Sequence, residues 1–508
     1  MKDRVCCSKA SRALGLPAAM GVLAAILVTW TLPTPLGPKD AAAEAPEGAR
    51  SSKGVEVLRD APSEGRFLSF GGKPIFIIGD SVTQGWVESG ESFDQEAWIR
   101  ALATRGIRAL LLWAFIAPDD GRDDRLGYDA PEMLPWERAG PRRWDLRRHN
   151  EAYFERLRAL CRLAEEKRIL VIITVFDGWT KTRFPAHPFN ESNGGPLRDR
   201  SRFVDLADDG REMPETFDPR WSPAEQNQYF QERLAARLIE ATRGLGNVLF
   251  ELFNEGEWYD REKRRRHEIH FLAFFRARSK SLLVSNADHI PGADFRREAR
   301  ADVLSHHRPN WSVSSRASES FEHFRREFEA SPPKPLLFSE PVPEFRAAGA
   351  DEVEAMTRLL WGTALAGSGF LVQNDASFGF DAKARIASRS KLRDLMLDRE
   401  GACSRFFHSL GVGWTSMRPD PGAASTGVAM ARRGQEYVVY SDGGASFTVD
   451  LEGFGGVAFE GRFYDPRAGD LLPALAVSGG GAAQPIVKPD ARDWVLWLRR
   501  RAEMAEPR

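Results

Sequence analysis

Two acidic side chains stand at the ends of apolar runs, where a buried strand would leave the core. The segment NVLFELFNE (residues 247–255) ends in Asn254 and Glu255, and KPLLFSEP (residues 334–341) brings Glu340 to a similar end. A solvated loop carries carboxylates without cost, so their placement here suggests chemistry. Two opposed carboxyl groups, one donating a proton and one acting on an oxocarbenium-like centre, are what cleavage of a glycosidic bond requires.

Side-chain alternation predicts how the first acid is aimed. Successive residues of a strand point to opposite faces, so Glu251, Phe253 and Glu255 share one face. Glu255 then ends a row that can point towards the mouth of a barrel, and Glu251 lies deeper, where it needs a cationic or hydrogen-bonding partner. Asn254, beside the acid, is predicted to hydrogen-bond a sugar hydroxyl next to the reacting carbon.

The same rule applies to the second acid, since Leu336, Phe338 and Glu340 share a face. In this reading Glu340 again stands at the end of its row, 340 − 255 = 85 residues after Glu255.

Eight apolar runs alternate with helical patterns and predict the scaffold that holds these acids. One helix is expected to begin at Ser222 and Pro223 and to end at Gly244. Strands that are apolar throughout, each followed by a helix, are typical of a parallel sheet covered on its outer face. We therefore expect an α/β fold, a (β/α)8 TIM barrel over residues 65–410 with its site at the carboxyl ends of the strands. The runs are residues 73–80, 107–115, 168–177, 247–255, 281–288, 301–307, 334–341 and 369–375.

The two acids fall on the fourth and seventh runs, which lie far enough apart around a ring to face each other across its mouth. Polar and aromatic residues near other run ends are candidates to bind sugar hydroxyls or rings. They are Asp80, Trp113, Asp177, Trp179, His187, Trp258, His306, His307 and Asn374.

The segments before and after the predicted barrel differ from it in sequence pattern. Basic residues precede an apolar run from Ala18 to Leu32, and Ala41 to Ala43 offers a small-residue cleavage site, so residues 1–43 are interpreted as a secretory signal or a membrane anchor. Residues 44–64 read as a linker. Short alternating strands separated by turns predict a small all-β sandwich over residues 411–501, followed by a tail at 502–508. The protein is expected to be secreted, or held at the cell surface or in the periplasm.

The charge, cysteines and histidines of the chain limit the classes of ligand and partner that we expect. The formal net charge of -1 gives no field for nucleic acid. Cys161 and Cys403 are expected to be buried thiols. His306 and His307 are neighbours on a strand and would point to opposite faces, so a shared metal ion is not expected. No cofactor and no oligomeric state are predicted.

Several of these motifs resemble those of known protein families. Asn254-Glu255 on a fourth strand with Glu251 before it, and Glu340 on a seventh, resemble glycoside hydrolase clan A. The segment GGKPIFIIGDSVTQGW (residues 71–86) is similar to the entry strand of its apiosidase-like branch. The segments YVVYSDGG, RFYDPRAGD and DWVLWLRR resemble the "putative collagen-binding" β-domain that follows such barrels.

The resemblance implies a retaining hydrolase with Glu255 as acid/base and Glu340 as nucleophile, acting on a carbohydrate. The two carboxyl groups should then lie roughly 5–5.5 Å apart. Two alternatives remain open at this point. One is a non-catalytic surface protein that binds a glycan or a matrix protein through a degenerate barrel and the β-domain. The other, a metal-dependent hydrolase, has little support in the sequence.

Overall fold

Eight parallel strands close into a ring in a computed structural model of the chain. The structure describes residues 54–60, 62–82, 87, 94–117, 133–178, 184–208, 210–254, 256, 259–286, 295–307, 312, 314–339, 341, 350–373, 391–480 and 485–501. The ring runs β4–β5–β8–β9–β10–β11–β12–β13. The predicted TIM barrel is thus confirmed. Its strands are β4 (Ile78–Val82), β5 (Ala109–Trp113), β8 (Leu170–Asp177), β9 (Val248–Asn254), β10 (Leu283–Asn286), β11 (Val303–His306), β12 (Leu336–Ser339) and β13 (Ser368–Val372).

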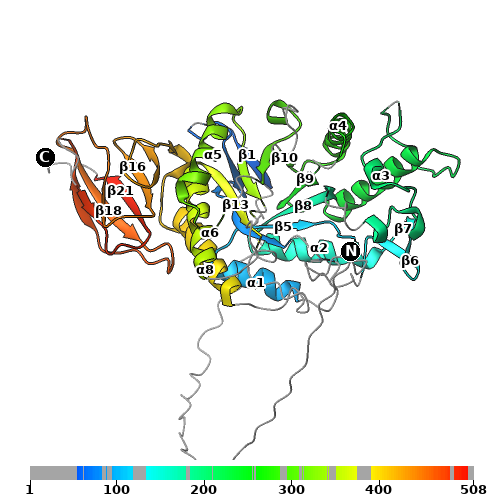
Figure 1. Cartoon of the computed structure of the whole chain (residues 1–508), viewed down its shortest axis with the longest axis horizontal. Coiled ribbons are helices and arrows are strands. Elements are labelled where there is room, and N and C mark those ends of the chain that lie inside the picture. The colour runs from blue at the N-terminus through cyan, green and yellow to red at the C-terminus, as the bar shows by residue number, and fades with distance from the viewer. Residues whose placement is uncertain are drawn as a thin grey trace, which may run out of the picture. The chain divides into compact units, whose positions relative to one another are not determined.

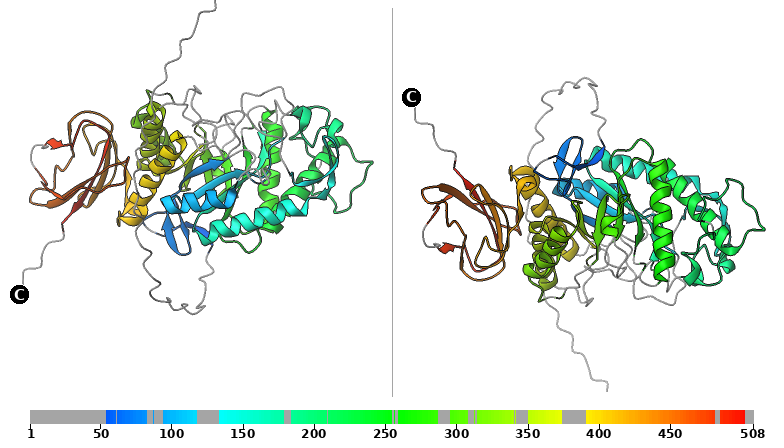
Figure 2. Two further views of the ribbon diagram at one scale, coloured as in Figure 1. Left: turned by 90° about the horizontal axis from the view of Figure 1, so that it is seen from below. Right: turned by 90° about the horizontal axis from the view of Figure 1, so that it is seen from above.

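Helices cover the outer face of this ring, which explains why its strands are apolar on both sides. In Figure 2 the cyan and green helices lie on one side of the strands and the yellow ones on the other. Ser222 caps α3 and Glu225 bonds back to it, as the predicted helix start requires. The helices are α1 (Gln95–Arg105), α2 (Glu151–Glu166), α3 (Pro223–Ala241), α4 (Arg261–Arg278), α5 (Ala317–Ala330), α6 (Ala350–Leu365) and α8 (Lys391–Ser409).

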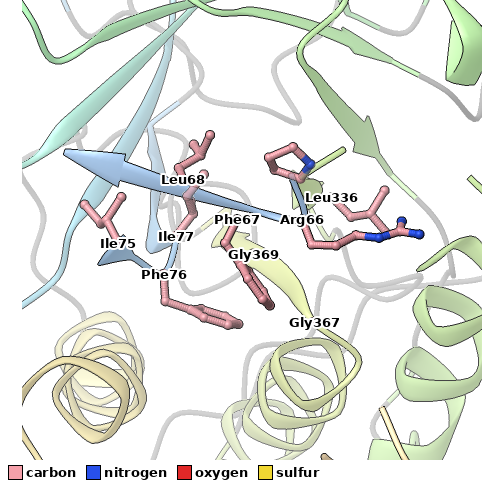
Figure 3. A pocket seen from close by; sticks show the side chains of 10 residues that line it. Arg66, Phe67, Leu68, Ile75, Phe76, Ile77, Leu336, Gly367 and Gly369 are labelled. Carbon is pink, nitrogen blue, oxygen red and sulfur yellow. The ribbon is translucent and has the colours of Figure 1, made fainter. Parts of the chain in front are cut away.

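A small antiparallel sheet closes the amino-terminal end of the ring. It consists of β1 (Val55–Leu58), β2 (Phe67–Phe70) and β3 (Lys73–Ile75). Leu68 and Ile77 share one apolar cluster with inward residues of the ring such as Leu337. Figure 3 shows the cavity left in this region, and its volume of about 10 Å³ has room for roughly one water. Side chains therefore fill the amino-terminal end of the ring.

The first predicted strand, residues 73–80, is two elements. β3 pairs with β2, whereas β4 pairs with β5 and β13 inside the ring. At the break the backbone N–H of Phe76 donates to Nε2 of His408 on α8 at 3.0 Å, and Nδ1 of His408 contacts the Ser404 carbonyl at 2.7 Å. Burial lowers the pKa of His408 to about 4, so the ring is neutral and can accept this bond.

Two regions between β5 and β9 contain elements that were not predicted. A hairpin of β6 (Trp136–Gly140) and β7 (Arg143–His149) precedes α2. After β8 the loop forms three short 3-10 turns, at Phe184–Ala186, Glu191–Asn193 and Arg200–Arg202.

The carboxyl-terminal part is antiparallel β-structure, as predicted. A six-stranded sheet has the order β14–β15–β16–β21–β18–β19, and a pair of strands, β17–β20, is separate from it. Figure 1 shows β16, β18 and β21 side by side. The strands are β14 (Arg418–Pro419), β15 (Val428–Arg432), β16 (Glu436–Ser441), β17 (Ser446–Thr448), β18 (Ala458–Tyr464), β19 (Leu475–Ser478), β20 (Pro485–Val487) and β21 (Trp494–Arg500).

Cys161 on α2 and Cys403 on α8 are buried and free, which confirms the prediction for both. Within the described part of the chain, no helix combines the length and apolar character needed to cross a membrane. The predicted leader, residues 1–43, lies outside the described residues.

Candidate active site at the carboxyl ends of the barrel strands

The strand count places the two acidic motifs as predicted. β9 is the fourth strand of the ring and ends at Asn254, and β12 is the seventh and ends at Ser339. Glu255 and Glu340 follow these ends directly in the sequence, but both lie outside the described residues, as do Trp179, Trp258 and Asn374.

Glu251 occupies the inside of the ring below these ends. Its Oε2 accepts a hydrogen bond from the Thr174 hydroxyl of β8 at 2.7 Å, and its Oε1 accepts one from the Ser305 hydroxyl of β11 at 2.6 Å. The side chain is fully buried. A buried carboxylate needs such donors, so the prediction that Glu251 lies deep and finds hydrogen-bonding partners is confirmed.

The predicted row of Glu251, Phe253 and Glu255 does not run straight. Phe253 packs against α4, with its ring centroid 5.3 Å from that of His267, whereas Glu251 points into the ring. Phe176 on β8 does the same beside Thr174, at 4.6 Å from Phe271. The alternation of faces therefore breaks in both strands near their carboxyl ends, and the shared row was wrong.

Asn254 is the last residue of β9, at the carboxyl end of the strand. It is fully buried, and its register partner is Asp177, so the two last strand residues lie at one level of the ring. Because Phe253 faces α4, its neighbour Asn254 faces the opposite side, the barrel interior. Within the described residues neither Nδ2 nor Oδ1 of Asn254 has a hydrogen-bond partner. An amide buried in this way lacks the bonds that normally offset its desolvation.

Two serines that sequence reasoning missed share this property. Ser81 on β4 pairs in register with Leu111, and Ser339 on β12 pairs with Leu371, and both leucines belong to the inward cluster. In the described part of the chain both serine hydroxyls are buried without a partner. The first, fourth and seventh strands thus each bring to the inside of the ring a polar group for which the described residues supply no partner.

The seventh strand turns a different row inward from the one that leads to Glu340. Leu336 clusters with Phe328 of α5, and Phe338 lies 5.2 Å from Phe324 of the same helix. Leu337 and Ser339 face the interior instead. Strict alternation would continue the helix-facing row to residue 340, so only a break like that of β9 would direct Glu340 to the mouth.

Trp113 is the other candidate on the inward side. It belongs to the inward apolar cluster at the end of β5, and it is buried. Asp177, the last residue of β8, is level with Asn254. His307 follows the end of β11 and is buried.

Three other candidates contact helices or the core of a loop, and their role as sugar ligands stays a prediction. Asp80 accepts a hydrogen bond at 2.8 Å from the indole nitrogen of Trp98 on α1. His306 packs on α5, with its ring 5.6 Å from that of Phe324.

His187 lies in the loop after β8, among the rings of Phe115, Phe184, Phe189 and Phe203. Burial lowers the pKa of His187 to about 3, so the ring is neutral. It forms part of the core of the loop.

A second buried acid stands behind β9 and β10. Glu268 on α4 accepts a hydrogen bond from Ser285 of β10 and lies 3.8 Å from the Arg264 guanidinium. Burial raises the pKa of Glu268 to about 7, against the opposing effects of Arg264 and Ser285, and the charge of Glu251 adds to the rise. Among the described residues no three His, Cys, Asp or Glu side chains are grouped as metal ligands.

Several solved structures of known proteins are similar to this one. A glycoside hydrolase of family 5 from Bacteroides vulgatus superimposes with a TM-score of 0.60 and 13% sequence identity, covering 88% of this chain and 93% of that one. The structure of a second glycoside hydrolase gives a TM-score of 0.60 and 15% identity over 88% of this chain and 97% of that one. The chain therefore has the fold of a family 5 glycoside hydrolase.

Residues 421–499 match the family described as "Putative collagen-binding domain of a collagenase". The barrel followed by this domain is what the sequence motifs implied. No curated protein matches the sequence.

Proposed function

We propose that the protein is a retaining glycoside hydrolase with Glu255 as acid/base and Glu340 as nucleophile. The observation that carries this proposal is Asn254, a buried amide on the inner side of the fourth strand, one residue before Glu255, for which the described residues supply no hydrogen-bond partner. A sugar hydroxyl would supply the missing bonds. Such a bond strengthens in the transition state and so contributes to catalysis.

The chemistry proceeds in two displacements. The Glu340 carboxylate attacks the anomeric carbon while Glu255 donates its proton to the leaving oxygen, and the glycosidic bond breaks. Glu255 then takes a proton from water, which attacks the same carbon and releases Glu340. Ser81 and Ser339 are placed to bind further hydroxyls from the first and seventh strands. No metal or cofactor takes part in this scheme.

Substrate class and location belong to the same proposal. The segment at residues 71–86 supports an apiosidase-like enzyme acting on a plant, microbial or host glycan. The basic residues and apolar run at the amino terminus support export, either released or anchored in the membrane.

A glycan screen tests the proposal, with wild type compared with Glu255→Gln and Glu340→Gln. We expect wild type to release sugar with retained anomeric configuration, and each substitution to abolish release. An inverted product would replace the mechanism, because inversion places the carboxyl groups roughly 6.5–9.5 Å apart. Unchanged hydrolysis in both variants would refute the assignment.

A non-catalytic binding protein is the second candidate. The match of residues 421–499 to a domain described as collagen-binding favours it, as does the helix-facing row that leads to Glu340. In that case no glycan is hydrolysed, and binding to glycan or matrix protein survives both Glu→Gln substitutions.

A further inference from the structure

Arg264 is an arginine buried behind the fourth strand. It lies in the first turns of α4 and is only 1% exposed, whereas its neighbour Arg265 is exposed. Its guanidinium carbon lies 5.5 Å from the centre of the Phe253 ring. Burying a cationic side chain is costly, so the fold keeps it where it has a use or good partners.

The same side chain fills the space beside Gly256. A β-carbon added to Gly256 would lie 2.3 Å from Nε of Arg264 and 2.6 Å from its Cδ and Cζ. No real β-carbon tolerates such distances, so glycine at 256 allows the guanidinium to approach the backbone there. Arg264 thus touches the residue before Asn254-Glu255 and the residue after it.

A buried ion pair holds Arg264 in place. Glu268, one helical turn further along α4, lies 3.8 Å from the guanidinium and is fixed by the Ser285 hydroxyl of β10. Phe253, Gly256 and α4 are therefore tied to the neighbouring strand through one side chain. Because the planar guanidinium lies between the Phe253 ring, the backbone at Gly256 and the Glu268 carboxylate, its freedom to move is small.

From this geometry we infer that Arg264 is a positioning residue, which fixes the Asn254-Glu255 pair from behind the strand. The inference rests on the proposed function, since it concerns the placement of the proposed acid/base. The contacts of Arg264 at residues 253 and 256 lie on either side of the pair, just after the point where the alternation of β9 breaks. Proton transfer depends on such placement.

Misplacing an acid has a kinetic signature that a loss of stability lacks. Proton donation matters most when the leaving group is a poor one, and least when the leaving group departs as a stable anion. A general fall in the folded fraction lowers both rates equally. The dependence of rate on leaving group therefore separates positioning from stability.

The experiment uses nitrophenyl and phenyl glycosides of a sugar that wild type hydrolyses. Arg264→Lys keeps the charge but loses the planar group, and Arg264→Met with Glu268→Gln removes both members of the ion pair, so that no unpaired charge stays buried. Arg265→Lys and Arg265→Met on the exposed side of the same helix are the matched controls. We expect both Arg264 variants to lose about 100-fold in kcat/KM on the phenyl glycoside, and much less on the nitrophenyl glycoside.

The controls should behave as wild type. Thermal melting of each variant shows whether it folds, and the double variant is expected to melt closer to wild type than Arg264→Met alone without regaining kcat. Equal losses of kcat/KM on both glycosides, or wild-type kcat/KM in the Arg264 variants, would overturn the positioning role while Glu255→Gln still abolishes activity. If wild type hydrolyses no glycoside and no glycan, the proposed function itself fails, and the positioning role with it.

Discussion

Asn254 and Asn247 are the same residue type near the two ends of one strand, and their surroundings are opposite. Nδ2 of Asn247 donates to the carbonyls of Cys161 and Ile169, both at 3.0 Å. In the described part of the chain Asn254 has no such bond. The first amide stabilises the fold, whereas among the described residues nothing offsets the burial of the second. Residues kept at a cost to stability are typical of functional sites.

Asn254→Leu is therefore expected to raise the free energy of unfolding by about 1–3 kcal/mol, because a buried amide without partners is exchanged for an apolar group of similar size. The same change should lower kcat/KM for any glycan that the wild type cleaves. Asn247→Leu should lower the free energy of unfolding by about 1–3 kcal/mol, since it removes two buried hydrogen bonds to backbone carbonyls. Urea titration at pH 7 measures both. Destabilisation by Asn254→Leu as large as that by Asn247→Leu would show that Asn254 has partners in the free protein.

At the scale of elements, the eight barrel strands were predictable because a strand covered on both faces is apolar throughout. The same property hides which row of each strand faces inward. Leu336 and Leu337 are alike in sequence, yet one contacts α5 and the other the ring interior. For this reason Asp80 and His306, chosen by chemical type, proved to face helices, whereas the inward Ser81 and Ser339 were missed.

The break in the first predicted strand and the β6–β7 hairpin could not be predicted from the sequence either. Residues 73–80 are apolar on both sides of the break at Phe76, and what ends the strand there is a bond to His408, more than 300 positions later in the sequence. The β6–β7 hairpin is rich in arginine and carries only a few buried side chains, so its alternation is weak. Contacts of this range leave no local pattern.

The junction of α4 with β10 carries a pH dependence that can be tested. The pKa of Glu268 is raised from its ordinary 4.5 to about 7. Between these values the folded state holds a proton that the unfolded state has lost, so the free energy of unfolding falls as pH rises from 4.5 to 7. The decline is on the order of 3 kcal/mol at most.

Glu268→Gln should remove that decline, because glutamine does not ionise. Urea midpoints at pH 5 and pH 8 provide the measurement, and the difference between wild type and variant isolates Glu268 from other titrating groups. Glu262→Gln, on the exposed side of the same helix, is the control and should follow wild type. Parallel curves for wild type and Glu268→Gln would mean that Glu268 ionises normally in the folded protein.

At the scale of the whole molecule, strand β16 in the six-stranded sheet of the β-domain is buried on both faces. Tyr437 and Val439 of β16 share a core with Phe447 and Ile486 of the separate strand pair. The alternate residues of β16, Val438 and Tyr440, belong to a core with Trp361 and Phe406 of helices α6 and α8. A sheet used in this way is part of the barrel's own packing, and is unlike a module on a flexible tether.

The contacts of Tyr440 show how the β-domain packs on the barrel helices. Tyr440 stacks on Trp361 with ring centroids 5.8 Å apart and planes at 9°, and its hydroxyl donates to Asp493 at 2.9 Å. Arg358 of α6 bonds the same carboxylate at 3.2 Å. Aromatic stacking and a shared carboxylate thus join a barrel helix to two parts of the β-domain.

We therefore expect barrel and β-domain to unfold together, in a single calorimetric transition of the chain comprising residues 44–508. Tyr440→Ala should cost about 3–5 kcal/mol, as for other large aromatic truncations in a core, and should lower that one transition as a whole. Hydrogen exchange should then accelerate in peptides of α6 as well as in those of β16 and β21. Val487→Ala is the control, because this β20 side chain is 71% exposed. Two transitions, of which Tyr440→Ala moves only one, would show instead that the β-domain folds on its own and is merely attached to the barrel.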